Sequence, residues 1–388
     1  MERSNGRILT THTGSLPRSP ALLQMLVSLS KRGEVDAAAL AREIEESTLH
    51  VVQRQLEAGI DVGNNGEQAR ESFFTYVQHR LSGFGGESNR PVMSDIMAFP
   101  SFLQLKLPEY TGRTMVDMMR GPKAIGEVRH STLEPLRQEC DAYEAATATQ
   151  EGEFAESFMT AASPGIVCAA MLNEHYHSYE DYVFAVAEGL RPEYEHIISR
   201  GFVLQIDCPD LAMERHTSFA GKELPEFQRF VATNIEAINR ATKGQPRDRI
   251  RLHACWGNYE GPHHHDVPLE AILPLLYEAN AGAFVLPLAN PRHAHEWRLF
   301  ERYPLPVEAL IVAGVIDTTT NYVEHPEVVA ERINNVAEAV GDASRVLAGT
   351  DCGFATSAGF GEVAEEVVWE KLRTLRAGAD LASARLFA

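Results

Sequence analysis

The stretch Arg249-Ile250-Arg251-Leu252-His253-Ala254-Cys255 joins a strand-like run to a pair of ligand-type side chains. Because a strand sends residues i and i+2 to the same face, the His253 imidazole and the Cys255 thiol are expected to point together. Asp351-Cys352-Gly353 follows another strand-like run and offers a second thiol. One imidazole and two thiolates are ligands that zinc prefers, and a catalytic zinc keeps one position for substrate. The sequence therefore predicts a Zn²⁺ site made of His253, Cys255 and Cys352.

Short β-rich runs alternate with longer helical patterns along the rest of the chain, which is typical of βα units and a parallel sheet. The strand-like runs are 7–12, 60–63, 158–162, 202–207, 250–255, 283–288, 310–317 and 345–351. The helical patterns between them include 37–58, 179–200, 225–242, 268–279, 326–340 and 362–377. About eight strands, each followed by a helix, predict a (β/α)8 TIM barrel. Residues 1–388 are expected to form one domain, with a hairpin-like excursion near residues 82–121, which are rich in Gly, Pro and aromatic residues.

Composition limits the classes of function that the chain can serve. Its 388 residues, 44% of them hydrophobic, can bury a large core. Five cysteines are an odd and sparse set, which argues against a disulfide framework and for a reducing compartment. A net charge of −19 would repel nucleic acid and anionic membrane surfaces. With neither a membrane-length apolar run nor a signal peptide, we expect a cytoplasmic protein that binds no nucleic acid and no membrane. Its oligomeric state, including a homo-oligomer, stays open.

Polar side chains follow several strand-like runs at the point where each run ends. Glu67 follows Gly66, Asp207 ends Gln205-Ile206-Asp207, and Asp317 ends Gly314-Val315-Ile316-Asp317. Barrel enzymes place their active sites at the carboxyl ends of the strands, so these carboxylates should meet at one mouth as candidate catalytic residues. Structural alternatives remain, because buried Cys and His are common in cores and Glu67 and Asp207 could be caps or ion-pair partners.

Other reactive side chains carry weaker signals. Arg292, in Asn290-Pro291-Arg292-His293, is a candidate clamp for an anionic substrate group. The adjacent residues His263-His264-His265 cannot all face one ion and are interpreted as loop or mouth lining. The remaining cysteines, Cys140, Cys168 and Cys208, are most simply structural.

Together these motifs resemble the catalytic barrel of cobalamin-independent methionine synthase. The resemblance is carried, in order and over nearly the whole chain, by Thr10 to Arg18 (TTHTGSLPR), Gly66-Glu67, Gln205-Ile206-Asp207, His253-Ala254-Cys255 and Gly349 to Gly353 (GTDCG). Full-length plant and bacterial enzymes of that family have two barrels, whereas this chain has room for the catalytic one. In its length it is more similar to the single-barrel relatives of that family, which include short methionine synthases and epoxyalkane:coenzyme M transferase.

The resemblance implies a role for each matching residue. His253, Cys255 and Cys352 would hold zinc, and Glu67 and Asp207 would take the amino group of an amino-acid thiol. The loop Thr13-Gly14-Ser15 would close around the carboxylate of that thiol. By the same resemblance, this sequence differs from the family at three positions. Pro287 stands where the family has a fourth, Glu ligand. Ala170 falls near the Trp that stacks on folate, and Thr319 falls near the His that assists proton transfer.

These observations predict a zinc-dependent transfer of a methyl or alkyl group to a homocysteine-type thiol, and they leave the donor, including the use of folate, open. An alternative enzyme attacks an epoxide with a sulfonated thiol such as coenzyme M, for which cations such as Arg18 and Arg292 should lie at the mouth. A third possibility is a metal-binding or regulatory barrel without turnover, in which a thiol would leave the zinc coordination unchanged.

Overall fold

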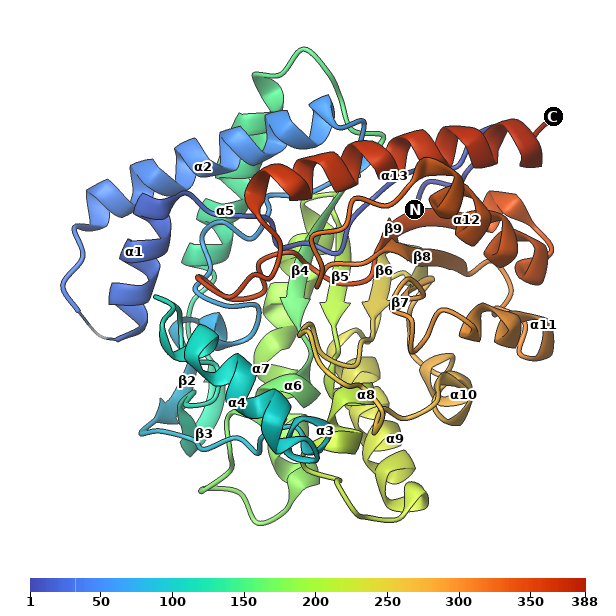
Figure 1. The fold of residues 1–388 in the computed structure, drawn as a ribbon. Coiled ribbons are helices and arrows are strands. Elements are labelled where there is room, and N and C mark those ends of the chain that lie inside the picture. The colour runs from blue at the N-terminus through green and yellow to red at the C-terminus, as the bar shows by residue number, and fades with distance from the viewer. Residues whose placement is uncertain (32) are drawn as a thin grey trace.

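The centre of the protein is a curled, parallel sheet of seven strands, seen in a computed structural model that describes residues 1–31 and 33–388 (Figure 1). Its order is β1 (Val62–Gly63), β4 (Glu156–Ala162), β5 (Val203–Asp207), β6 (Ile250–His253), β7 (Ala283–Pro287), β8 (Leu310–Ile316) and β9 (Val346–Thr350). Every residue of β5 to β9 is buried, as expected for parallel strands covered on both faces.

Thr10 and Thr11 close the gap between the two edge strands. Thr10 forms a parallel bridge with Ala348 of β9, and Thr11 forms one with Val62 of β1. The backbone N–H of Thr11 donates to Ala348 O at 2.9 Å, and the N–H of Val62 donates to Thr10 O at 3.0 Å. The strand expected at 7–12 is reduced to these two residues, because its partner β1 is only 2 residues long. The predicted (β/α)8 barrel is confirmed.

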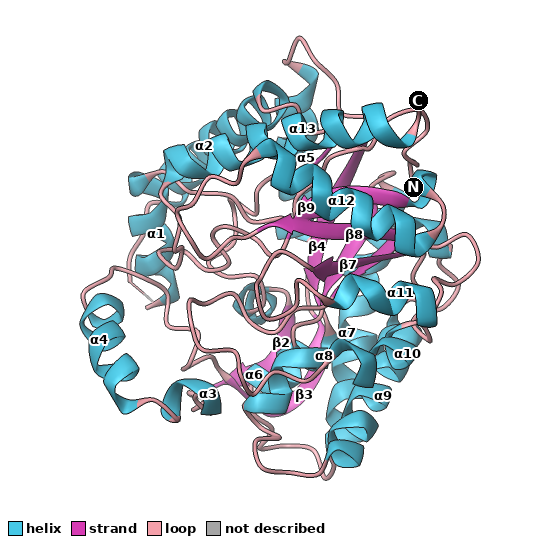
Figure 2. Cartoon of the chain, turned by 45° about the vertical axis from the view of Figure 1, so that its right-hand side comes forward, coloured by secondary structure: helices cyan, strands magenta, loops and turns pink. Residues whose placement is uncertain are grey.

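Helices lie outside the strands, as Figure 2 shows. They are α1 (Pro20–Ser30), α2 (Ala37–Glu57), α5 (Glu134–Ala148), α6 (Pro164–Ala170), α7 (Tyr179–Ser199), α8 (Asp210–Met213), α9 (Leu224–Ala241), α10 (Leu273–Leu276), α11 (Leu299–Arg302), α12 (Pro326–Val340) and α13 (Glu365–Leu386). No helix within the described residues has the length and apolar character needed to cross a bilayer.

The largest helical difference from the sequence pattern lies at 268–279. This segment forms a 3₁₀ turn at Leu269–Ala271 followed by the short α10, not one continuous helix. Pro274 lies in the first turn of α10, where its missing N–H is tolerated, whereas the same ring inside a longer helix would remove a hydrogen bond.

The excursion expected near 82–121 is an antiparallel hairpin with helices inserted at its tip. Strands β2 (Leu81–Gly85) and β3 (Lys123–His130) pair from Leu81 with His130 to Gly85 with Lys123. Between them lie α3 (Ser94–Met97) and α4 (Pro100–Thr111), which stand apart from the outer helices of the barrel in Figure 2. This inserted segment, residues 86–122, carries side chains to the barrel mouth.

Candidate functional site

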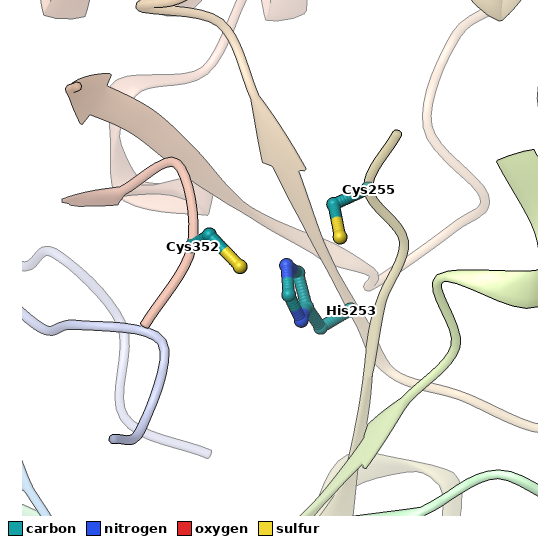
Figure 3. A group of neighbouring side chains, drawn as sticks. All are labelled: His253, Cys255 and Cys352. Atoms are coloured by element: carbon teal, nitrogen blue, oxygen red, sulfur yellow. The ribbon is translucent and has the colours of Figure 1, made fainter. Parts of the chain in front are cut away.

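Three ligand-type side chains meet at the carboxyl ends of the barrel strands. His253 ends β6, Cys255 lies two residues beyond it, and Cys352 follows β9. Their ligand atoms all lie within 4.8 Å of one another, and all three residues are buried. Figure 3 shows the two sulfur atoms and the imidazole ring turned toward one another. The geometry fits a metal that takes one nitrogen and two sulfur ligands.

Asp207 fixes the orientation of the His253 ring. Its Oδ1 lies 3.0 Å from His253 Nδ1, which assigns the proton of the neutral ring to Nδ1. The other ring nitrogen, Nε2, is buried and has no hydrogen-bond partner in the protein. Histidines that ligate a metal commonly bond a carboxylate through the other ring nitrogen. The arrangement of Asp207, His253 and the two thiols matches this pattern, with Nε2 as the nitrogen available to a metal.

The electrostatics of the two thiols favour a thiolate at Cys255. The pKa of Cys255 lies well below its usual value, chiefly because the Cys352 thiol hydrogen-bonds to it and also because His253 lies beside it. The pKa of Cys352 is raised well above its usual value by the same contact and by burial. The pair therefore shares one proton, which a divalent cation would displace, because a thiolate and not a thiol ligates metals.

Glu67 presents a free carboxylate oxygen to the same site. Its backbone is left-handed, with φ of 56°, and its N–H donates to Asn65 Oδ1 at 3.0 Å. Thr160 Oγ1 donates to Glu67 Oε1 at 2.9 Å, whereas Oε2 is buried and has no partner in the protein. Burial, and then the charge of Asp207, raise the pKa of Glu67 to about 7. The site therefore holds a carboxylate that a cationic group would stabilise.

These residues line one cavity at the barrel mouth, whose empty volume of about 840 Å³ includes its opening to solvent. Its polar floor consists of Thr13, Ser15, Glu67, Asp207, His253, Cys255 and Cys352. Its upper wall is mainly apolar and is lined by Phe73, Phe74, Pro91, Met93, Met118, Met119, Pro209, Met213 and Phe360. Gly14 belongs to the same loop and approaches Glu67 so closely that a Cβ there would lie 2.7 Å from Oε1.

Three predicted residues, Arg18, Arg292 and Asp317, do not line this cavity. The Arg18 guanidinium donates to three backbone carbonyls, those of Ala355, Glu67 and Arg70. It therefore braces the loop around Glu67. Arg292 is exposed, and its guanidinium lies 3.3 Å from His264 O.

A smaller cavity lies on the other side of the two thiols. It is lined by Cys255 and Cys352 together with Pro287, Asp317 and Thr319, among others. Asp317 accepts hydrogen bonds there from its own loop, including one from Thr319 Oγ1 at 2.9 Å. Pro287 offers no ligand atom at the position where the family has Glu. Ala170 is buried at the end of α6 and is not among the residues that line either cavity.

The sequence analysis missed two supports of the site. Asp351 accepts hydrogen bonds from the N–H groups of Leu288, Ala289 and Asn290 at 3.0, 2.9 and 2.7 Å, which ties the loop after β7 to the residue next to Cys352. The apolar wall was also missed, although the methionines of segment 82–121 were a visible signal.

Comparison with known proteins points to one family. Residues 8–152 match the family model described as the catalytic domain of cobalamin-independent synthase. A methionine synthase of Saccharolobus solfataricus is 24% identical over 89% of this chain and 87% of its own length. One from Sulfolobus acidocaldarius is 26% identical over 89% and 85%.

A solved structure shares the fold. It is a B12-independent methionine synthase from Shewanella sp. W3-18-1 in complex with selenomethionine. It superposes with a TM-score of 0.73 at 20% identity and covers 98% of this chain and 99% of its own. Together with the sequence matches, it confirms the predicted resemblance of this chain to the catalytic domain of the cobalamin-independent methionine synthases, and it shows that the two share the barrel fold.

Proposed function

We propose that this protein is a zinc-dependent transferase that moves a methyl group onto the thiol of a homocysteine-like amino acid. The observation that carries the proposal is the joint placement of two features in one cavity. The ligand atoms of His253, Cys255 and Cys352 lie within 4.8 Å of one another, and Glu67, which has a buried carboxylate oxygen without a hydrogen-bond partner, lines the same cavity.

The residues divide the work as follows. His253, Cys255 and Cys352 would hold zinc, which lowers the pKa of a thiol that coordinates it and so supplies a thiolate near neutral pH. Glu67 and Asp207 would bind the ammonium group of the amino acid. Thr13 and Ser15 line the floor beside them and would receive its carboxylate. In the transfer, the sulfur forms a bond to carbon, the bond from that carbon to its leaving group breaks, and the leaving group takes the electron pair and the proton.

The known activities and ligands of similar proteins support an amino-acid ligand. The curated relatives from Saccharolobus and Sulfolobus are methionine synthases, and the Shewanella relative was solved with selenomethionine. An ammonium group next to Glu67 would offset the burial of that carboxylate, whose pKa is about 7 without it.

The epoxide alternative receives less support from the placement of the cations. A sulfonated thiol needs a cation at the mouth, but Arg18 donates to three backbone carbonyls, and neither Arg18 nor Arg292 lines the cavity. The acidic floor favours a substrate that carries an amine.

Thiol consumption tests the proposal. The zinc-loaded protein is offered L-homocysteine or coenzyme M, each with methyl donors and with epoxides, and the loss of free thiol is followed. We expect consumption of homocysteine with a methyl donor, its loss in Cys352→Ser, and its retention in Cys140→Ser, which changes a buried cysteine on α5 outside the site. Equal consumption by the Cys352 and Cys140 variants would refute the proposal. Consumption of coenzyme M with an epoxide would replace it with the alternative.

A further inference from the structure

The cavity has two chemically different zones. Its carboxylates and ligand-type groups come from the ends of the barrel strands and the loops that follow them, whereas aromatic, proline and methionine side chains make up most of the remaining lining, together with Arg90, Asn258, Tyr259 and Thr356. The proposed function accounts for the floor, because metal, ammonium and carboxylate binding all occur there. The wall lines the part of the cavity that these groups leave free, which is where a carbon donor can lie.

The methionine wall, defined as Met93, Met118, Met119 and Met213, is a built part of the cavity. The first three come from the inserted segment 86–122, and Met213 ends α8 of the barrel. Each is at least half-buried. Methionine side chains are unbranched and polarisable, so they adapt to apolar groups of different shapes.

Two buried contacts hold the inserted segment against the barrel. Arg90 pairs with Glu214 at 2.5 Å, and Glu214 is itself fully buried. Asp95 of α3 accepts hydrogen bonds from Tyr259 Oη at 2.6 Å and from the N–H of His263 at 2.9 Å. These two contacts attach the inserted segment, which carries Met93, Met118 and Met119, to loops of the barrel. The position of the wall relative to the barrel mouth is therefore fixed.

The charge of the cavity disfavours an anionic donor. Arg90 is the one arginine or lysine among the described lining residues, and its guanidinium already pairs with Glu214. The lining carboxylates Glu67 and Asp207 would repel a second anion. Apolar surface buried against the wall, in contrast, is stabilised by about 25 cal/mol per Å².

From these observations we propose that the methionine wall selects an uncharged donor whose transferred carbon carries an apolar substituent, so that groups longer than methyl are accepted. The proposal rests on the proposed function, since it assumes that the sulfur of an amino acid lies on the floor. It names the substrate class of the upper zone: an uncharged alkyl donor, not a polyanionic pterin.

A homologous series of thioether products measures the upper zone directly. Methionine and S-ethyl-, S-propyl- and S-butyl-L-homocysteine share the amino-acid end and differ only in the alkyl group on sulfur. Binding of each to the zinc-loaded full chain is measured by titration calorimetry. We expect the dissociation constant to fall about three- to fourfold for each added methylene, because each buried methylene contributes about 0.8 kcal/mol.

Substitutions test whether the methionine wall causes the dependence of affinity on alkyl chain length. Met118→Gln should flatten the dependence of the dissociation constant on chain length. Met97→Gln is the matched control, since Met97 belongs to the same inserted segment but is 54% exposed and does not line the cavity. It should leave the slope unchanged.

The outcomes separate the two proposals. If methionine binds but affinity is constant or falls with chain length, the methionine wall does not select alkyl groups and this inference is wrong, while the proposed function stands. If no member of the series binds, both proposals are wrong. Displacement of S-butyl-L-homocysteine by a lower concentration of 5-methyltetrahydrofolate, which is anionic, would also overturn the inference.

Discussion

At the scale of single residues, Glu67 has several features that lower the stability of the folded protein. The residue has a left-handed backbone, one unpaired buried oxygen and a pKa of about 7. Such features destabilise a folded chain and persist where the surrounding structure holds them, as Asn65 and Thr160 do here. An ammonium group supplied by substrate would remove most of the penalty.

Glu67→Gln is therefore expected to stabilise the fold while weakening substrate binding. A carboxylate whose pKa is raised by folding destabilises the protein once pH exceeds its unfolded value near 4.5, and the penalty is complete above about pH 7. We expect the variant to gain up to about 3 kcal/mol in urea unfolding at pH 8 and nothing at pH 4. Homocysteine affinity should fall about tenfold or more, with zinc retained.

Glu71→Gln is the matched control, because the neighbouring carboxylate has the opposite shift. Burial alone would raise the pKa of Glu71, but hydrogen bonds from His79 and Thr75 hold it below its usual value. Its charge therefore stabilises the protein at neutral pH, and this stabilisation is lost as pH falls. Loss of stability in both variants at pH 8 would contradict the account of Glu67.

Asp207 supports the metal site through His253. Asp207→Asn should keep the ring in place but remove the carboxylate behind it, and such changes typically lower metal affinity 10- to 100-fold. Competition with a zinc chelator measures this. Asp210→Asn, a buried carboxylate that bonds Ser163, serves as control and should leave zinc affinity unchanged. Equal zinc affinities for both variants would rule out the supporting role.

The ligand triad could be predicted from sequence because its signals are local. The i, i+2 spacing places His253 beside Cys255, and the position of Cys352 after a strand brings it to the same barrel end. The tautomer of His253 and the unpaired oxygen of Glu67 could not be predicted, since both depend on contacts between different strands. The backbone role of Arg18 has the same origin.

At the scale of elements, a buried cluster around Asp266 joins the loops next to the inserted segment. Asp266 Oδ2 lies 2.8 Å from His263 Nδ1 and 2.9 Å from His293 Nε2, and Oδ1 lies 3.1 Å from His216 Nδ1. Glu296 Oε2 lies 2.7 Å from the other nitrogen of His293. The cluster explains the His263-His264-His265 run: His263 fixes a loop, and no metal ligation is needed for it.

Asp266→Asn should destabilise the protein by about 3 kcal/mol or more, because it leaves buried imidazolium groups without their counter-ion. The acidic partners raise the pKa of His263, and that of His293 to about 9, although burial opposes both. Stabilisation from these histidines is complete below about pH 6.5 and is lost as pH rises through about 9.

The stability difference between wild type and Asp266→Asn should thus shrink between pH 6.5 and 9, as urea unfolding at several pH values would show. Asp266 itself has a lowered pKa, so its contribution is lost as pH falls below about 4. Glu296→Gln removes only one acceptor of His293 and should give a smaller alkaline change. A difference that is independent of pH would contradict this view of the cluster.

Elements with strong periodicity were predictable and elements governed by tertiary contacts were not. Helices α2, α7, α9 and α12 lie within one residue of the predicted ranges. The helices inserted between β2 and β3 were missed, because α4 carries Pro108 inside it and several exposed apolar residues, among them Leu105 and Leu107.

At the scale of the whole molecule, closure of the barrel depends on Thr10 and Thr11. Thr11→Pro removes the N–H that donates to Ala348 O and should lower the free energy of unfolding by about 1–3 kcal/mol. Thr11→Ala keeps this N–H and loses the hydroxyl, which donates to Val62 O at 2.8 Å and accepts a longer bond from Arg251 Nη1 at 3.3 Å, so it should lower stability by about 1 kcal/mol. Urea unfolding compares the two, and equal losses would mean that closure through the backbone is unimportant.

The (β/α)8 architecture could be predicted from the alternation of strand-like and helical runs, because each run is long enough to carry its own period. The cavity volume and its division into two zones could not. They arise from segment 86–122 packing over strands that are distant in sequence, with Arg90 and Asp95 as the contacts. The residues at the strand ends could thus be predicted from the sequence, whereas the lining contributed by the inserted segment could not.

X-ray absorption at the zinc edge tests the central claim, that His253, Cys255 and Cys352 hold a zinc ion that binds the substrate thiol. The zinc-loaded protein should show a shell with two sulfur atoms, from Cys255 and Cys352, and Cys352→Ser should lose one of them or the metal itself. Addition of L-homocysteine should add a third sulfur. A shell that contains fewer than two sulfur atoms, or one that L-homocysteine leaves unchanged, would contradict the account.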